Sequence, residues 1–217
     1  MNKTAETVLI TAGPTREKID AVRFLSNRSS GKMGYALAQA AAEAGFRVVL
    51  VSGPTALTPP EGVALIDVES AAEMARAVHR LAPSARLIIM AAAVADYRPL
   101  TAVDYKLKKL PGKLVLELER TEDILQSLGQ RKRPGQVLVG FAAETDDLLA
   151  NAQGKLERKN LDWIAANDVR SAVSGFGVDT NAITLLSRDG RQIEIPLADK
   201  LTVARRLLEI VARPISS

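Results

Sequence analysis

Apolar runs alternate with amphipathic stretches along most of this chain, and this alternation most limits its possible folds. The apolar runs have the length of buried strands and cover 8–10, 48–51, 63–68, 87–90, 136–142 and 161–166. Stretches with helical spacing cover 33–44, 71–81, 122–131, 146–159 and about 199–213. Strands that alternate with helices form parallel sheets, which bind ligands at the carboxyl ends of their strands. We therefore predict an α/β fold with a Rossmann-like, doubly wound, mainly parallel sheet.

Two segments depart from this alternation. Residues 105–109 and 113–119 alternate with period two around Pro111-Gly112, which predicts an inserted β-hairpin flap. Such a flap would be a lid over the site or a contact between subunits. A second hairpin is predicted over 181–197, with its turn at Asp189-Gly190. Because no repeat, low-complexity tract or linker interrupts the chain, we predict a single domain over 1–217.

Composition excludes several kinds of site. The 217 residues are 47% hydrophobic and 25% charged, which is typical of a soluble globular protein. The absence of cysteine excludes disulfides, thiolate zinc sites and a cysteine nucleophile, and the single histidine, His79, supports no catalytic triad. The net charge of +4 favours anionic ligands, but the basic residues are dispersed and aromatics make up only 4%, which argues against nucleic-acid binding. No apolar run is long enough for a membrane span and no signal pattern is present, so we predict a cytoplasmic protein.

A Gly/Ser-rich turn over 26–34 precedes the first predicted helix. Backbone N–H groups at such a helix start attract phosphate, and Ser29 or Ser30 is expected to cap the helix. The turn is not a Walker P-loop, because Met33 follows Gly31-Lys32 where serine or threonine is required. A dinucleotide-type glycine fingerprint is also missing after the first strand. The turn predicts a nucleotide or a phosphorylated substrate, with a plain capped helix as the alternative.

Small and polar residues follow most of the predicted strands, at 11–15, 52–54, 92–97, 140–145 and 166–168. Their recurrence at one edge of the sheet predicts an active cleft. Asp96 would accept hydrogen bonds from a sugar or base, or else cap a turn. Lys155 and Lys159 project from one helical face, toward a triphosphate or toward solvent. Lys106 and its neighbouring lysines would hold phosphate or protect a hairpin edge.

Longer sequence motifs indicate a function more specifically than residue spacing does. In chain order they are TAGPTRE, SNRSSGKMG, LVSGP, AAAVADYRP, the Lys-x-Lys-Lys hairpin, EDIL, VGFAAET, RKNLD and ANDV. Together they resemble bacterial phosphopantothenoylcysteine synthetase over nearly the whole chain. The resemblance implies a homodimeric ligase that joins 4′-phosphopantothenate to L-cysteine with CTP and Mg²⁺, through an acyl-cytidylate, releasing CMP and pyrophosphate. Many members also carry a flavin-dependent decarboxylase domain, so the chain would be a stand-alone enzyme or half of a fusion.

The resemblance also implies roles for particular residues. Asn27 would hold the acyl-nucleotide intermediate with support from Arg23, and Lys106 would act from the flap on both nucleotide and catalysis. The matching nucleotide positions, with those of the Gly/Ser turn, are Gly13, Ser29, Ser30, Gly31, Ala92, Asp96, Asp123, Ile124, Phe141, Lys155 and Lys159. Thr121-Glu122 replaces the family's common Asn-Pro; a backbone contact would survive this change, whereas a contact that needs the fixed φ of proline would not. No metal ligand is assigned.

Two other functions are compatible with such a sheet. One is a nicotinamide-dependent oxidoreductase, which the missing glycine fingerprint contradicts. The other is a non-catalytic module that senses nucleotides, which turnover of all three substrates would exclude.

Overall fold

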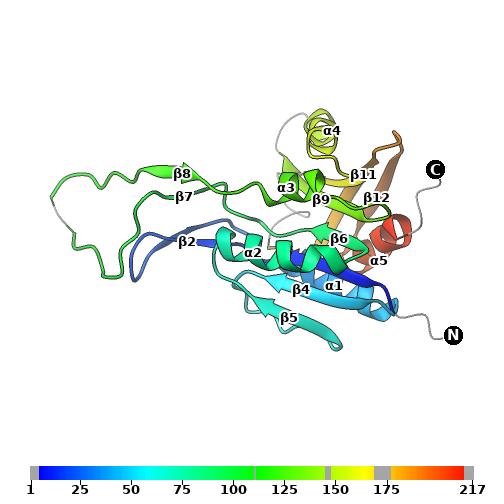
Figure 1. Ribbon diagram of the computed structural model, residues 1–217, viewed down its shortest axis with the longest axis horizontal. Coiled ribbons are helices and arrows are strands. Elements are labelled where there is room, and N and C mark those ends of the chain that lie inside the picture. The colour runs from blue at the N-terminus through cyan, green and yellow to red at the C-terminus, as the bar shows by residue number, and fades with distance from the viewer. Residues whose placement is uncertain (1–4, 110, 145–147, 169–176, 213–217) are drawn as a thin grey trace.

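The computed structural model describes residues 5–109, 111–144, 148–168 and 177–212 (Figure 1). An eight-stranded sheet lies at its centre, in the order β12-β11-β10-β9-β6-β1-β4-β5. Six neighbouring strands are parallel: β5 (Val63–Asp67), β4 (Arg47–Ser52), β1 (Thr7–Ala12), β6 (Leu87–Met90), β9 (Val137–Glu144) and β10 (Trp163–Asp168). The antiparallel hairpin of β11 (Thr180–Ser187) and β12 (Gln192–Asp199) completes one edge. The predicted α/β fold and the second hairpin are confirmed.

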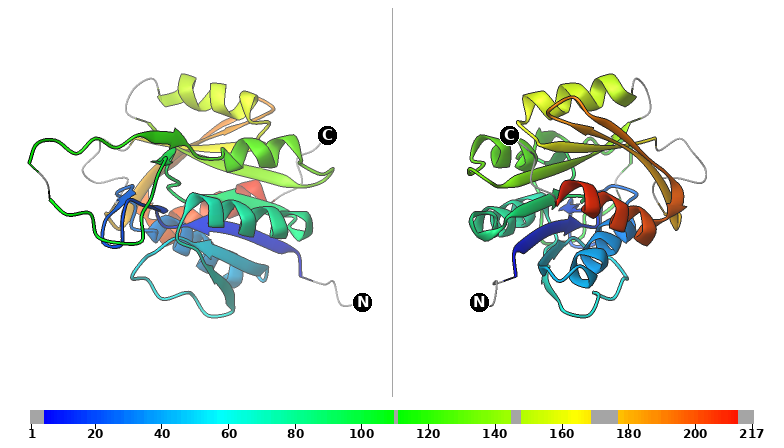
Figure 2. Two further views of the ribbon diagram at one scale, coloured as in Figure 1. Left: turned by 60° about the vertical axis from the view of Figure 1, so that its left-hand side comes forward. Right: turned by 90° about the vertical axis from the view of Figure 1, so that its right-hand side faces the viewer.

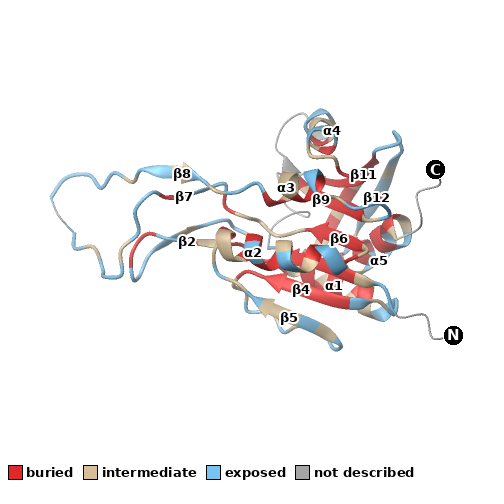
Figure 3. Ribbon diagram, viewed as in Figure 1, coloured by how far each residue is buried: buried red, intermediate tan, exposed pale blue. Residues whose placement is uncertain are grey.

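Helices cover both faces of the sheet (Figure 2). One core cluster packs α1 (Lys32–Glu43) and α5 (Lys200–Val211) on one face. The other packs α2 (Ala71–Leu81), α3 (Ile124–Gln130) and α4 (Leu148–Arg158) on the opposite face. Alternate strand residues supply the two clusters: Val8 and Ile10 belong to the first, and Leu9 to the second. The central parallel strands β1, β4 and β6 are therefore apolar on both sides and buried along most of their length, whereas the edge strand β5 is partly exposed (Figure 3).

The strand order places a crevice beside β1. The chain moves from β1 outward to β4 and β5, and then returns to β6 on the other side of β1. At such a reversal the connections leave the sheet toward opposite faces, so the carboxyl ends of the two central strands open onto a crevice. Because β1 pairs with β6 from Val8 to Thr11, the segments that follow these two strands lie side by side.

The flap differs from its prediction. Its paired strands are β7 (Tyr97–Pro99) and β8 (Leu118–Arg120), and the described residues between them form no strand. This long loop, which we call the arm (residues 100–117), projects from the body beside the hairpin of β2 (Arg16–Lys18) and β3 (Phe24–Ser26) (Figures 1 and 2). A period-two pattern stabilises a strand when one face is packed, whereas Tyr105, Leu114 and Val115 are all exposed here. The inserted hairpin is therefore confirmed at β7 and β8, but the predicted strand at 105–109 is wrong, and of the strand predicted at 113–119 only the last two residues are paired, in β8.

The predicted serine cap of α1 is also wrong. The N-cap residue is Gly31, with φ of 79°, and no side chain caps the helix. The predicted ends of elements at residues 145–146 and 213 lie outside the described residues, and α3 begins one residue after its cap, Asp123. No helix in the described part of the chain is long and apolar enough to cross a membrane. The single-domain assignment stays a prediction.

We predict that Gly34→Ala lowers the free energy of unfolding by about 1–3 kcal/mol, because overpacking is destabilising. A Cβ at Gly34 would lie 2.5 Å from the Ala12 Cβ and 2.9 Å from the Thr11 carbonyl oxygen, so α1 would have to move away from β1. Urea unfolding followed by circular dichroism measures the change.

The matched control is Gly154→Ala in α4, where a Cβ would meet no atom within 4 Å. There the substitution should stabilise by about 0.5–1 kcal/mol through helix propensity. If both variants raise or both lower the free energy of unfolding, the prediction is wrong, and position 34 does not need glycine because of the close packing of α1 on β1.

Candidate active site

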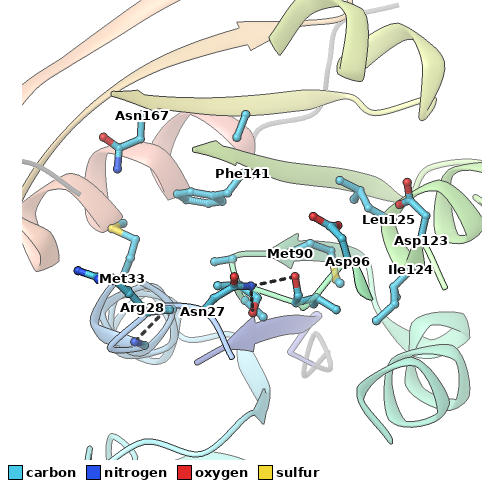
Figure 4. A pocket seen from close by; sticks show the side chains of 18 of the residues that line it. Asn27, Arg28, Met33, Met90, Asp96, Asp123, Ile124, Leu125, Phe141 and Asn167 are labelled. Carbon is cyan, nitrogen blue, oxygen red and sulfur yellow. Dashed lines mark hydrogen bonds between the residues drawn. The ribbon is translucent and has the colours of Figure 1, made fainter. Parts of the chain in front are cut away.

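A cavity of about 830 Å³ opens at the carboxyl ends of β6, β9 and β10 and is lined also by the turn 27–31 before α1. Figure 4 shows Asn27 near its middle, with Arg28, Met33 and Asn167 on one side and Asp96, Asp123 and Ile124 on the other. The structure brings together these residues of the predicted site: Asn27, Ser29, Ser30, Gly31, Ala92, Asp96, Asp123, Ile124, Phe141, Lys155 and Lys159. The predicted cleft at one edge of the sheet therefore exists. Gly13, Arg23 and Lys106 do not line it.

The segment after β6 forms one wall of the cavity and is held by hydrogen bonds from the segment after β1. The hydroxyl of Thr11 accepts from the Ala92 N–H at 3.1 Å, and that of Thr15 accepts from the Ala95 N–H at 2.9 Å. The Ala93 N–H donates to the Gly13 carbonyl at 2.9 Å. Both threonines are fully buried, so these bonds are shielded from water. The sequence analysis assigned them no role, because a threonine in an apolar strand has no distinctive spacing.

Asn27 extends this network. Its side-chain nitrogen donates to the Ala93 and Val94 carbonyl oxygens, at 3.1 Å each (Figure 4). Both partners only accept hydrogen bonds, so the amide must turn its NH₂ group toward them. The two side-chain N–H groups of Asn27 therefore stabilise the wall of the cavity. Its carbonyl oxygen, Oδ1, is the side-chain atom that could accept a hydrogen bond from a ligand.

The start of α1 forms the floor of the cavity beneath Asn27. Gly31 makes the turn into the helix, and a Cβ there would lie 2.7 Å from the Thr55 Cγ2. Gly13 supports this turn from behind: its φ is 75°, and a Cβ there would lie 2.8 Å from the Gly53 carbonyl oxygen. The first turn of α1 contains no acidic side chain, so the positive end of the helix dipole faces the cavity uncompensated.

Two lysines, Lys155 in α4 and Lys159 directly after it, lie at the Asp123 end of the cavity. The Lys159 ammonium contacts both oxygens of Asp123, at 3.0 and 2.8 Å, and Asp123 also caps α3 by accepting from the Gln126 N–H. Lys155 lines the cavity one helical turn before Lys159. The prediction that both lysines project from one face is confirmed.

Further cations lie at the opposite end and were missed by the sequence analysis. Lys200, the first residue of α5, lines the cavity although it is only 6% exposed. Burial lowers the pKa of its ammonium, the charge of Lys32 lowers that pKa further, and Asp179 acts in the opposite direction. Nothing in the local sequence distinguishes Lys200 from an ordinary helix residue.

Arg23 and Lys106 lie outside the cavity, Arg23 in the turn of the β2–β3 hairpin and Lys106 on the arm. Arg23 pairs with the buried Asp20 at 2.6 Å and donates to the Leu107 carbonyl at 3.3 Å, so it ties the arm to the β2–β3 hairpin. The Arg23 guanidinium holds the pKa of the Asp20 carboxyl well below its usual range. Lys106 is exposed on the same part of the arm. The structure therefore does not bring these two residues together with the other predicted site residues.

The sequence and the fold were compared with known proteins. The chain is 52% identical over 206 residues to the coenzyme A biosynthesis bifunctional protein CoaBC of Bacillus subtilis, covering 94% of this chain and 50% of the relative. It is 48% identical over 209 residues to a cysteine/cysteine sulfinic acid decarboxylase of an unknown prokaryotic organism, covering 94% of this chain and 58% of that protein. The chain thus spans only about half the length of these curated relatives.

A solved structure and a family description agree with these relatives. The crystal structure of the C-terminal domain of CoaBC superposes with a TM-score of 0.81 at 48% identity, over 94% of this chain and 92% of that one. The family described as the DNA/pantothenate metabolism flavoprotein C-terminal domain matches residues 4–215. On the extent of this match and the identity of its relatives, the chain belongs to the DNA/pantothenate metabolism flavoprotein C-terminal domain family.

Proposed function

We propose that this chain is a CTP-dependent phosphopantothenate–cysteine ligase of coenzyme A biosynthesis. The observation that carries the proposal is the single cavity that gathers most of the predicted site residues, in a chain of this family. A helix N-terminus at its floor and lysines at both ends suit it to substrates with several phosphate groups. The relatives named for coenzyme A biosynthesis support the substrate assignment.

The proposed reaction has two steps. The carboxylate of 4′-phosphopantothenate attacks the α-phosphate of CTP, forming an acyl-cytidylate and releasing pyrophosphate. The cysteine amine then attacks the acyl carbon and expels CMP, losing one proton as the amide forms. Both nucleophiles belong to substrates, so the protein has to position the reactants and stabilise phosphate charge. This matches a chain without cysteine, whose one histidine, His79, contacts the cavity residue Glu122 and does not itself line the cavity.

Several cavity residues have direct parts in this chemistry. The N–H groups at the start of α1 and the ammonium groups of Lys155 and Lys159 would stabilise phosphate oxygens. Lys159 would exchange Asp123 for a phosphate, which carries more charge. Ala92 presents its backbone to the base or sugar, and Phe141 supplies an apolar surface above Asn27 (Figure 4).

Magnesium binds nucleotides through phosphate oxygens and one or two carboxylates. No three ligating side chains cluster as a metal site among the residues that the structure describes. Asp96, Glu122 and Asp123 line the cavity, and one or two of these carboxylates would hold a Mg²⁺ that arrives with CTP. The ion would neutralise phosphate charge during the first step.

The proposal includes three properties of the whole protein. The chain acts as a homodimer, it is joined to or works beside a flavin-dependent decarboxylase, and it acts in the cytoplasm, where CTP is made. The bifunctional relatives, of which the chain spans about half, support the fusion. An oxidoreductase remains the less favoured alternative, since the glycine fingerprint for a dinucleotide is missing from the turn after β1.

We expect the purified protein to form CMP and pyrophosphate when CTP, Mg²⁺, 4′-phosphopantothenate and L-cysteine are all present. With ATP in place of CTP, kcat/KM should fall about tenfold or more, because each mismatched buried polar group costs about 1–3 kcal/mol. Chromatography of the nucleotides measures both rates. No turnover would favour a nucleotide-sensing module, and equal kcat/KM for the two nucleotides would exclude the choice of CTP.

Asn27→Asp should reduce kcat at least tenfold while the protein stays folded. A carboxylate cannot donate to the Ala93 and Val94 carbonyl oxygens, and it repels both of them and the substrate phosphates. Steady-state kinetics gives kcat, and thermal unfolding serves as the control for folding. A variant with wild-type activity would show that Asn27 has no role in the reaction and only belongs to the turn before α1.

Lys106→Gln is expected to preserve acyl-cytidylate formation and to slow its conversion to the amide. Its place on the arm suits a lysine that closes over a bound intermediate and excludes water. Quenched single-turnover reactions with labelled CTP separate the two steps. Lys113→Gln, which removes an exposed charge elsewhere on the arm, is the matched control. Conversion by Lys106→Gln at the wild-type rate would contradict the flap role.

A further inference from the structure

The chain enters α3 through three consecutive residues that line the cavity, Thr121, Glu122 and Asp123. Each of their side chains contacts a different part of the protein. The Thr121 hydroxyl donates at 2.6 Å to a backbone carbonyl of the wall that follows β6. Glu122 contacts His79 in the last turn of α2, and Asp123 contacts Lys159 after α4. These contacts hold the start of α3 against the cavity.

The short helix α3 depends on such contacts for its position. It has only seven residues, and isolated helices of this length are not stable in water. Ile124 and Leu128 pack into the core, and at the far end the Asn160 side chain donates to the Gly129 carbonyl at 2.7 Å. The position of the end that borders the cavity therefore rests on the contacts made by residues 121–123.

His79 and Glu122 form a short hydrogen bond between α2 and this entry. His79 Nε2 lies 2.6 Å from Glu122 Oε1. An ionised carboxylate only accepts hydrogen bonds, so the ring nitrogen donates. Hydrogen bonds to a carboxylate are stronger than those between neutral groups, and the His79 side chain, at 22% exposed, is partly shielded from competing water.

Nucleotide binding would remove one of the three contacts. In the proposed function Lys159 exchanges Asp123 for a phosphate, and the hydrogen bond that Asp123 accepts from the Gln126 N–H lies within α3 itself. The start of α3 then loses its link to α4 while the nucleotide is bound beside it. His79 does not line the cavity, so a ligand there does not compete for its ring, and its bond to Glu122 can persist.

We propose that His79 is a positioning residue for the nucleotide: through Glu122 it keeps the start of α3 in place while Lys159 is engaged by phosphate. The inference rests on the proposed function, which places CTP at this end of the cavity. Asp123 and Ile124 lie on one side of Asn27 (Figure 4). Loss of the His79 ring therefore weakens the binding of CTP and leaves that of 4′-phosphopantothenate as it is.

The test measures binding without turnover. Isothermal titration calorimetry gives Kd for CTP alone and for 4′-phosphopantothenate alone, with EDTA present so that Glu122 cannot act through a metal ion. His79→Ala should raise Kd for CTP about three- to tenfold, as expected for the loss of a partly exposed hydrogen bond to a charged group. The same substitution in a Glu122→Ala background should have no effect, because its partner is already gone.

Two further variants distinguish positioning from a general structural role. His79→Gln keeps a side-chain N–H donor and should bind CTP more tightly than His79→Ala does. Arg80→Ala, which removes an exposed cation from the same turn of α2, is the matched control and should leave both Kd values unchanged. Thermal unfolding shows whether each variant is folded, and His79→Gln keeps the inference falsifiable if His79→Ala is not.

Three results would overturn the inference. They are an unchanged Kd for CTP in His79→Ala, an equal loss of affinity for 4′-phosphopantothenate, and a loss of the same size in the Glu122→Ala background. If His79→Ala is unfolded, a His79→Gln variant that binds both ligands with equally reduced affinity would also overturn it.

The same data separate this inference from the proposed function. A protein that forms no CMP but binds CTP in a manner that depends on His79 contradicts the proposed function alone. A protein that forms product while His79→Ala binds CTP as the wild type does contradicts the positioning role alone. A wild type that binds no CTP contradicts both.

Discussion

Two buried threonine hydroxyls hold the wall of the cavity, and the geometry of the site depends on them. Thr11 and Thr15 lie in and just after β1, and each accepts a backbone N–H from the segment that follows β6. Without these bonds two buried N–H groups would lose their partners, at a cost of about 1–3 kcal/mol each. The carbonyl groups of Ala93 and Val94, fixed in this way, in turn orient Asn27. The position of the Asn27 side chain in the cavity thus depends, through these hydrogen bonds, on the pairing of β1 with β6.

Each end of the cavity pairs a lysine with a carboxylate. Lys159 contacts Asp123, and Lys32 contacts Asp179. The Asp179 side chain is 85% exposed and that of Asp123 is 42% exposed, and ion pairs accessible to solvent contribute only about 0–1 kcal/mol. A phosphate, with about twice the charge of a carboxylate, can replace them at little cost. The carboxylates would therefore limit repulsion among the lysines without preventing the binding of a substrate.

In the arm, the alternation of apolar and polar residues does not predict the structure that forms. Its alternating residues have the period of a strand, yet pairing is confined to β7 and β8 at its base. Tyr105, Leu114 and Val115 face solvent because the arm leaves the sheet and the described part of the chain provides no second layer to cover it. Its contacts with the body run instead through Asp20 and Arg23, in which charge and backbone hydrogen bonds replace apolar packing.

The sequence by itself determined the order of strands and helices, because apolar periodicity is local and is set by burial on one or both faces. It also predicted that small and polar residues would gather where the parallel strands end, since such ends must share one edge of the sheet. Only the tertiary structure decided that Gly31, and not a serine, begins α1, because the close approach of Thr55 determines that turn. It also decided that Thr11 and Thr15 hold the wall of the cavity from behind, that Lys200 lines the cavity and that Arg23 does not. These placements depend on contacts between residues that are far apart in the chain. The contacts form only when β6 pairs beside β1 and α5 packs against α1, so local residue spacing cannot predict them.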